Sequence, residues 1–214
     1  YLESKRAVDE KYFGPLVKTI MTRCIHCTRC VRFATEVAGV PELGATGRGE
    51  TMEIGTYVEK ALSSELSGNI IDLCPVGALT SKPYGYSART WELGRKKSIS
   101  PHDSLGSNLV VQTKGGRVLR VVPLENDDLN ECWISDRDRF SYEGLNSPDR
   151  LTRPMIREGG EMREVDWQTA LGFAAKLLSE ARDQHGPDSL GLLASPQSTG
   201  EEMFLAQKLM RGLG

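Results

Sequence analysis

The spacing of four cysteines constrains this chain more than any other feature. Three of them form the run Cys24-x-x-Cys27-x-x-Cys30, and a fourth, Cys74, lies far along the chain, directly before Pro75. A [4Fe–4S] cube needs four thiolates at the corners of a tetrahedron. A loop with two-residue gaps can reach three of those corners, and the remote Cys-Pro can reach the fourth. The spacing therefore predicts a [4Fe–4S] site whose ligands are Cys24, Cys27, Cys30 and Cys74.

The same cysteines leave other kinds of site open. In two-cluster ferredoxins a further cysteine lies four residues after the third, and here that position is Ala34, so we expect a single cluster. Four cysteines can also hold zinc, although zinc sites usually come as two separated C-x-x-C pairs and this set is three plus one. Disulfides are a further alternative. The chain has five cysteines, and this odd number favours a reducing compartment over a disulfide framework.

Several residues near the cysteines are candidates for tuning the site. Arg23, Arg29 and Arg32 flank the ligands, and their positive charge would offset the negative charge of a thiolate-bound cluster unless they simply face solvent. His26 lies between two ligands, and we expect it beside the site or at the surface rather than on iron. The lone Cys132 is expected to be a small buried hydrophobic residue.

The composition and the remaining motifs exclude several functions. The 214 residues carry 27 Lys plus Arg and 29 Asp plus Glu, a net charge of −2 that argues against a nucleic-acid binder. No apolar run approaches the roughly 18 residues of a membrane span. The glycine-rich segment 44–49 does not match a dinucleotide fingerprint and is expected to be a turn. We therefore expect no catalytic residue, no nucleic-acid partner and no direct membrane span.

Local patterns predict an α+β chain with three zones after a connector. The connector is expected at 1–15, and the zones at 16–90, 91–150 and 151–214. In the second zone, residues 109–113 and 117–122 predict a hairpin around Gly115-Gly116, with Val110, Val118 and Val121 as core candidates. In the third, the apolar spacing from Trp167 to Ala181 predicts a helix with Asp166 as its N-cap and a stop at Gly186-Pro187. Residues 190–194 predict a buried parallel strand. Ser198 and Thr199, each three residues before a Glu, predict the start of another helix.

Several stretches resemble the large iron–sulfur subunits of respiratory complex I, the NADH–quinone oxidoreductase of bacteria and mitochondria. The first two are the most specific, and together the stretches extend over almost the whole chain. They are MTRCIHCTRCVRFATEVAG (21–39), SELSGNIIDLCPVGALTSKP (64–83), WEL with the following SISPHDSLGSN (91–108), NECWISDRDRF (130–140) and ASPQSTGEE (194–202).

The resemblance implies a domain order and a function. It implies a small ferredoxin-like [4Fe–4S] domain at 16–90, then a β-rich domain at 91–150, then the start of an α/β molybdopterin-oxidoreductase-like domain at 151–214. It implies one [4Fe–4S] cluster that relays single electrons from NADH and flavin toward quinone. Implied partners are the flavin- and NADH-binding subunit and neighbouring iron–sulfur subunits. The implied location is peripheral, on the cytoplasmic face of the bacterial inner membrane or the matrix side of the mitochondrial one.

The resemblance also implies what this stretch does not carry. Relatives of the second zone hold another cluster, and the corresponding positions here are Ser100, Asp103, Ser107 and Ser135. Because hydroxyls and one carboxylate are poor iron–sulfur ligands, we expect that cluster to be absent. The chain starts at Tyr1 and not Met, so we expect a fragment, with the family's further clusters upstream. A subunit of an NAD-linked hydrogenase or formate dehydrogenase is an alternative, and a zinc-stabilised interaction module is another.

Overall fold

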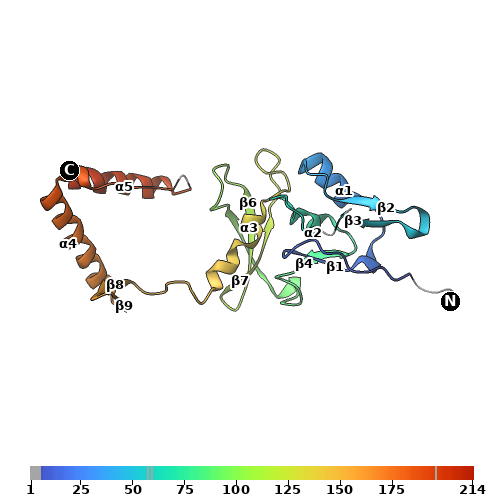
Figure 1. Cartoon of the computed structure of the whole chain (residues 1–214), viewed down its shortest axis with the longest axis horizontal. Coiled ribbons are helices and arrows are strands. Elements are labelled where there is room, and N and C mark those ends of the chain that lie inside the picture. Colours follow the sequence, from blue (N-terminus) through green and yellow to red (C-terminus); the bar gives the residue numbers. More distant parts are fainter. Residues whose placement is uncertain (1–5, 57, 59, 196) are drawn as a thin grey trace. The chain divides into compact units, whose positions relative to one another are not determined.

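The computed structural model describes residues 6–214 apart from 57, 59 and 196, and within them the chain forms two compact units. Figure 1 shows the elements along the chain. The first unit, Tyr1–Asn146, holds β1 (Val17–Thr19), α1 (Arg29–Arg32), β2 (Gly44–Thr46), β3 (Glu53–Gly55), α2 (Asn69–Leu73), β4 (Leu79–Ser81), β5 (Gly94–Ile99), β6 (Asn108–Lys114), β7 (Arg117–Pro123) and α3 (Asp136–Phe140). The second unit, Ser147–Gly214, holds β8 (Met155–Glu158), β9 (Glu161–Glu164), α4 (Trp167–His185) and α5 (Gly200–Leu213).

The cysteine-bearing part of the first unit is built on two short antiparallel strand pairs. Strand β1 pairs with β4, and β2 pairs with β3. The segment 44–49, expected as a turn, is therefore a strand at 44–46, and the turn follows it at Gly47, whose φ is +73°. The apolar residues of this region share one core made of Phe13, Val17, Met21, Phe33, Ala34, Leu43, Ile54, Ile70 and Leu79. Part of the expected connector thus packs into the core through Phe13, while residues 1–5 of it lie outside the described residues.

Strands β5, β6 and β7 form a three-stranded antiparallel sheet. The predicted hairpin is present, and Gly115 and Gly116 both have positive φ, at +58° and +77°, as a two-residue turn of this hand requires. Its core differs from the expected one at one position. Val118 and Val121 pack with Leu109, Val111 and Ile134, whereas Val110 lies outside that cluster. The reason is the period of two along a strand, which places Val110 on the opposite face from Leu109 and Val111.

A buried polar network joins the segment 66–72 to the segment 134–139 within the first unit. Asn69 is 1% exposed; its amide nitrogen donates to the Ile134 carbonyl, and its amide oxygen accepts from the Ile134 N–H and from Arg139. The Asp136 carboxylate accepts from the Ser67 hydroxyl and the Gly68 N–H. A Cβ at Gly68 would lie 2.7 Å from that carboxylate, so the close approach requires glycine.

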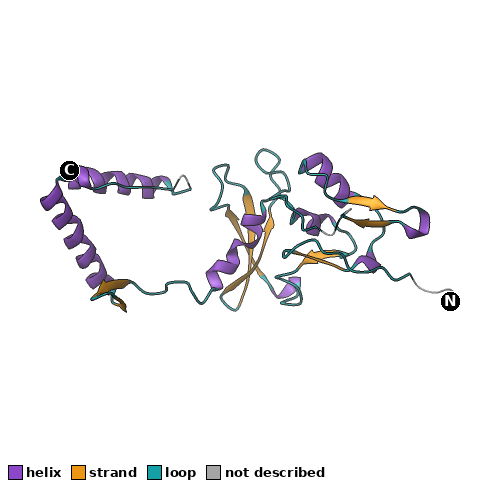
Figure 2. Ribbon diagram, in the orientation of Figure 1, coloured by secondary structure: helices purple, strands orange, loops and turns teal. Residues whose placement is uncertain are grey.

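In the second unit both predicted helices are present, but the predicted strand is not. Helix α4 begins after Asp166, whose side chain accepts from the Thr169 N–H, and it ends at Gly186. Helix α5 begins after Thr199, which forms a capping box with Glu202. Figure 2 shows α4 and α5 as the helices that lead to the C-terminus. The strand expected at 190–194 is wrong: these residues form no strand and are largely exposed, because no described strand lies beside them for pairing. Within the described residues, no helix is both long and apolar enough to cross a membrane.

Candidate metal centre

The loop that carries the first three cysteines is tightly wound. Cys24 follows a short 3-10 turn, and His26 and Thr28 adopt left-handed conformations with φ of +54° and +59°. His26 lies directly before Cys27, and Thr28 lies two residues before Cys30. The left-handed backbone at these two residues lets the chain reverse direction between the cysteines. The His26 N–H donates to the Cys24 sulfur at 3.4 Å. The residues after Thr28 form α1, which carries Cys30.

The fourth cysteine reaches the same place through the β1–β4 pair. Cys74 is the C-cap of α2, and its backbone is extended with ψ of 108°, as expected for a residue before proline. The chain then turns and enters β4, where Leu79 pairs with Thr19. Just beyond β1, the Ile20 N–H donates to the Ala78 carbonyl at 2.7 Å. This pairing places the segments that lead to Cys24 and away from Cys74 side by side.

All four predicted ligands line one small cavity. Cys24, Cys30 and Cys74 are half-buried and Cys27 is exposed. The rest of the lining is mostly apolar and comprises Met21, Ile25, Thr28, Arg29, Ile54, Val76, Ala78 and Leu79. Four thiols converging in a largely apolar pocket are the donor set of an iron–sulfur cluster. The structure therefore brings together the residues that the spacing singled out.

The electrostatics of the cavity favour a bound cation. Burial raises the pKa of the Cys30 thiol to about 11, and negative charge on Cys24, Cys27 and Cys74 raises it further, although the Val31 N–H bond to the sulfur opposes this. A thiolate in this place is costly unless positive charge compensates it.

The spacing of the ligands is a separate matter. Among the described residues, no three His, Cys, Asp or Glu side chains come close enough together to hold a single metal ion. Four thiolates around one zinc stand roughly 4 Å apart, whereas in a cubane each binds a different iron, and the set is wider.

The three arginines that flank the cysteines in the sequence lie in different surroundings. Arg29 lines the cysteine cavity, whereas Arg23 lines a neighbouring one. Arg32 is exposed and bonds Glu36 through two nitrogens, at 3.1 and 3.2 Å, so its charge is already paired.

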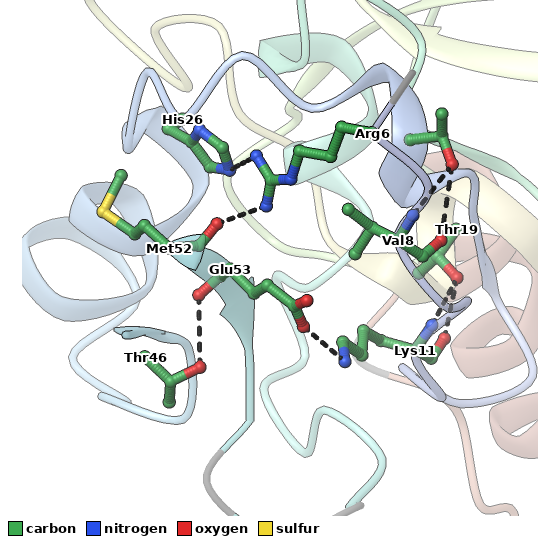
Figure 3. Close-up of polar contacts among 9 residues, drawn as sticks. Arg6, Val8, Lys11, Thr19, His26, Thr46, Met52 and Glu53 are labelled. Atoms are coloured by element: carbon green, nitrogen blue, oxygen red, sulfur yellow. Dashed lines mark hydrogen bonds and ion pairs between the residues drawn. The ribbon is translucent and has the colours of Figure 1, made fainter. Parts of the chain in front are cut away.

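His26 lies beside the ligands and is held by a residue that the sequence reasoning missed. The Arg6 guanidinium donates to His26 Nε2 at 3.1 Å and also to the Met52 carbonyl (Figure 3). Because a guanidinium can only donate, Nε2 accepts, and the neutral ring carries its proton on Nδ1. Arg6 lies in the expected connector, and its positive charge was the only sequence signal that it carried.

The four positions at which relatives of the second zone hold a cluster carry hydrogen bonds here. Ser100 and Ser135 both donate to the carboxylate of Asp138, which is 3% exposed, and Ser107 donates to Asp103. Burial raises the pKa of Asp103, but hydrogen bonds from Ser107 and Gly106 outweigh it and lower that pKa below its usual value. Oxygen atoms thus satisfy one another at these positions. Asp138, which ties two of them together, was not among the sequence candidates.

Cys132 is exposed, so the expectation that it is buried is wrong. Its neighbours supply the packing instead. The Trp133 ring lies against Phe33, with centroids 4.9 Å apart, and Ile134 is 2% exposed. The tight turn before it, where Glu131 has a φ of +47°, leaves Cys132 on the outside.

The four converging thiols define the class of the protein, since this donor set is that of an iron–sulfur protein. Residues 14–80 match the family described as NADH-quinone oxidoreductase subunit 3, ferredoxin-like domain. Residues 93–143 match the NADH-ubiquinone oxidoreductase NDSU1/NuoG-like, 4Fe-4S domain, and residues 150–214 match the molybdopterin oxidoreductase family. These matches follow the domain order that the resemblance implied.

Individual relatives give the particular family. The chain is 51% identical over 212 residues to the NADH-ubiquinone oxidoreductase 75 kDa subunit of Reclinomonas americana, and 47% identical over 212 residues to an NADH-quinone oxidoreductase subunit of Rickettsia conorii. It is 52% identical over 210 residues to the mitochondrial NADH-ubiquinone oxidoreductase 78 kDa subunit of Candida albicans. The alignments cover 98–99% of this chain but 29–31% of those proteins. Over almost its whole length the chain is thus homologous to large subunits of NADH–quinone and NADH–ubiquinone oxidoreductases, and it spans about three tenths of the length of these relatives.

Proposed function

We propose that this chain relays single electrons within an NADH:quinone oxidoreductase through one [4Fe–4S] cluster held by Cys24, Cys27, Cys30 and Cys74. The observation that carries the proposal is the convergence of these four cysteines in one cavity. When bound, such a cluster supplies one-electron transfer without making or breaking a bond in a substrate.

The residues of the chain act on that site in separate ways. The four thiolates bind iron, and the left-handed residues His26 and Thr28 turn the loop so that successive cysteines reach it. Met21, Ile54 and Leu79 line the cavity and limit the access of water. Arg29 contributes positive charge from the cavity wall. Arg6 contributes positive charge from its position beside His26, to which it donates a hydrogen bond.

The second zone contributes packing and no second cluster. Ser100 and Ser135 donate to Asp138, and Ser107 donates to Asp103. Iron in a sulfide cube prefers thiolates to such oxygen atoms. This is why the proposal assigns one cluster to these 214 residues.

The NADH:quinone oxidoreductase activity belongs to the whole assembly. The partners in the proposal are the flavin- and NADH-binding subunit on the donor side and neighbouring iron–sulfur subunits on the acceptor side. The location is peripheral, at the cytoplasmic face of a bacterial inner membrane or the matrix side of a mitochondrial one. The relatives named above are subunits of NADH–quinone or NADH–ubiquinone oxidoreductase, which favours this role over a hydrogenase or formate dehydrogenase subunit.

Spectroscopy of the anaerobically reconstituted chain tests the proposal. We expect a brown protein whose visible absorbance bleaches on reduction, with one low-temperature EPR signal per chain in the reduced state. The chain should not oxidise NADH by itself, since it has no dinucleotide or flavin motif. A colourless protein that retains zinc would instead support the interaction module.

A further inference from the structure

A second, larger cavity lies in the first unit, beside the cysteine cavity. It has a volume of about 530 Å³, within the range of small-molecule sites. Its walls come from β1, β4, β7, α2 and α3 and from the loop at 82–89. Cys74 and Leu79 line both cavities, so this one borders the candidate metal centre.

The lining of this cavity is strongly cationic. Lys18, Arg23, Arg89, Arg120 and Arg139 line it, and Asp72 is the one acidic residue among the lining residues. The Asp72 carboxylate is already paired, because it accepts a hydrogen bond from the Arg139 guanidinium at 2.6 Å. Within the part of the chain that the structure describes, the other four cations make no ion pair. Positive charge gathered in a concave surface concentrates anions.

Aromatic rings lie beside two of these cations. The Arg120 guanidinium lies 4.6 Å from the centre of the Tyr84 ring, and its Nε donates to Gln112 at 2.7 Å. The terminal nitrogens of Arg120 make no hydrogen bond to any described residue, so they are available to a ligand. The Lys18 ammonium lies 5.1 Å from the centre of the Tyr86 ring. Stacking of this kind fixes a cation without neutralising it.

The loop that carries these rings has an unusual backbone. Tyr86 has a φ of +63°, which is an outlier for a bulky residue, and the residue is 91% exposed. Tyr84 anchors the loop by donating its hydroxyl to the Ala88 carbonyl at 2.7 Å.

We propose that this cavity binds a phosphate-bearing small molecule. Guanidinium groups match the geometry of phosphate oxygens and bind them through paired hydrogen bonds. Arg89 and Arg120 bind the phosphate, Lys18 adds charge at the rim, and the Tyr84 and Tyr86 rings border any group attached to the phosphate. The proposal stands on this cavity alone and does not depend on the cluster.

Calorimetric titration of the full 214-residue chain tests the site. The probes are inorganic phosphate and adenosine monophosphate, in about 0.15 M sodium chloride to screen diffuse attraction. We expect saturable binding of one phosphate group per chain. Arg89→Gln and Arg120→Gln should each weaken it about tenfold. Tighter binding of the nucleotide than of phosphate would support a ligand that also contacts the rings.

Lys97→Gln is the matched control, because Lys97 is an exposed cation on β5 that does not line the cavity. It should bind both probes like the unmodified chain. Circular dichroism and thermal melting establish that each variant is folded, and a second pair, Lys18→Gln and Arg23→Gln, replaces any that is not. No saturable binding, or equal weakening by Lys97→Gln, would overturn the proposal.

Discussion

At the scale of single residues, the arginines near the candidate metal centre differ in their partners: some form an ion pair with a carboxylate and others do not. Arg32 forms a bidentate contact with Glu36 at the surface. Arg6 instead donates to His26 and to the Met52 carbonyl, and the Glu53 carboxylate, whose pKa its charge helps to lower, is paired with Lys11. A positive charge near a cluster stabilises its reduced form, and a neighbouring negative charge cancels the effect at a distance.

Replacing Arg6 by Gln should therefore lower the midpoint potential of the cluster on the order of tens of millivolts. Arg32→Gln is the control and should shift the potential much less, since it removes one partner of an exposed pair. Redox titration followed by EPR measures both. Equal shifts in the two variants would show that Arg6 acts only as one more surface charge.

The thiol of Cys30 makes the iron-depleted chain sensitive to alkali. Burial raises its pKa in the folded chain to about 11, from the ordinary thiol value of 9.0 that applies when the chain is unfolded and the thiol is exposed. A raised folded-state pKa means that the contribution to stability is complete below pH 9 and is lost as the pH rises toward 11. The free energy of unfolding should fall by up to about 3 kcal/mol across this window. Denaturant titrations of the chain and of Cys30→Ala, both iron-free, measure the difference, which should vanish if the thiol is not responsible.

At the scale of elements, the sequence predicted those that have strong local signals. The hairpin of β6 and β7 follows from Gly115-Gly116, and α4 and α5 follow from their caps. The strand expected at 190–194 failed because an apolar run forms a strand only where another strand pairs with it, and a pattern does not report its neighbours.

The cap of α5 gives a prediction at this scale. Two residues had the right spacing, and the structure selects Thr199, whose hydroxyl accepts from the Glu202 N–H at 3.2 Å. Thr199→Ala should destabilise the start of the helix by about 1 kcal/mol, while Ser198→Ala should have little effect. Hydrogen exchange of the amides in the first turn reports this. If both variants lose protection alike, the capping box is not what starts the helix.

At the scale of the molecule, the two parts of the first unit are joined by contacts that no local pattern reveals. The sequence singled out the four cysteines that line one cavity, because the chemistry of a cluster sets the spacing of its ligands. It did not reveal Arg6, Asp138 or the contacts of Asn69, because these depend on residues far apart in sequence meeting in space. Long-range hydrogen bonds of this kind leave no periodicity to read.

The network around Asn69 predicts how the unit loses structure when iron is removed. Metal binding contributes to folding around the cysteines, and Asn69 links that region to Ile134 and Arg139. Amides at 130–140 should lose protection from hydrogen exchange together with those around Cys27, whereas β6 should retain more, since it has sheet partners on both sides. Asn69→Ala should cost about 3 kcal/mol and weaken the link. Uniform loss of protection across β6 and 130–140 would contradict this division.

The iron and sulfide content of cysteine variants tests the central claim most directly. The account predicts about four irons and four sulfides per chain in the reconstituted protein and in Cys132→Ala, because Cys132 is exposed and takes no part in the cavity. Cys74→Ser should lose the cluster, with the loss of its EPR signal, because it removes one of the four thiolates. About four irons per chain in Cys74→Ser, or loss of iron in Cys132→Ala, would contradict the assignment of the ligands.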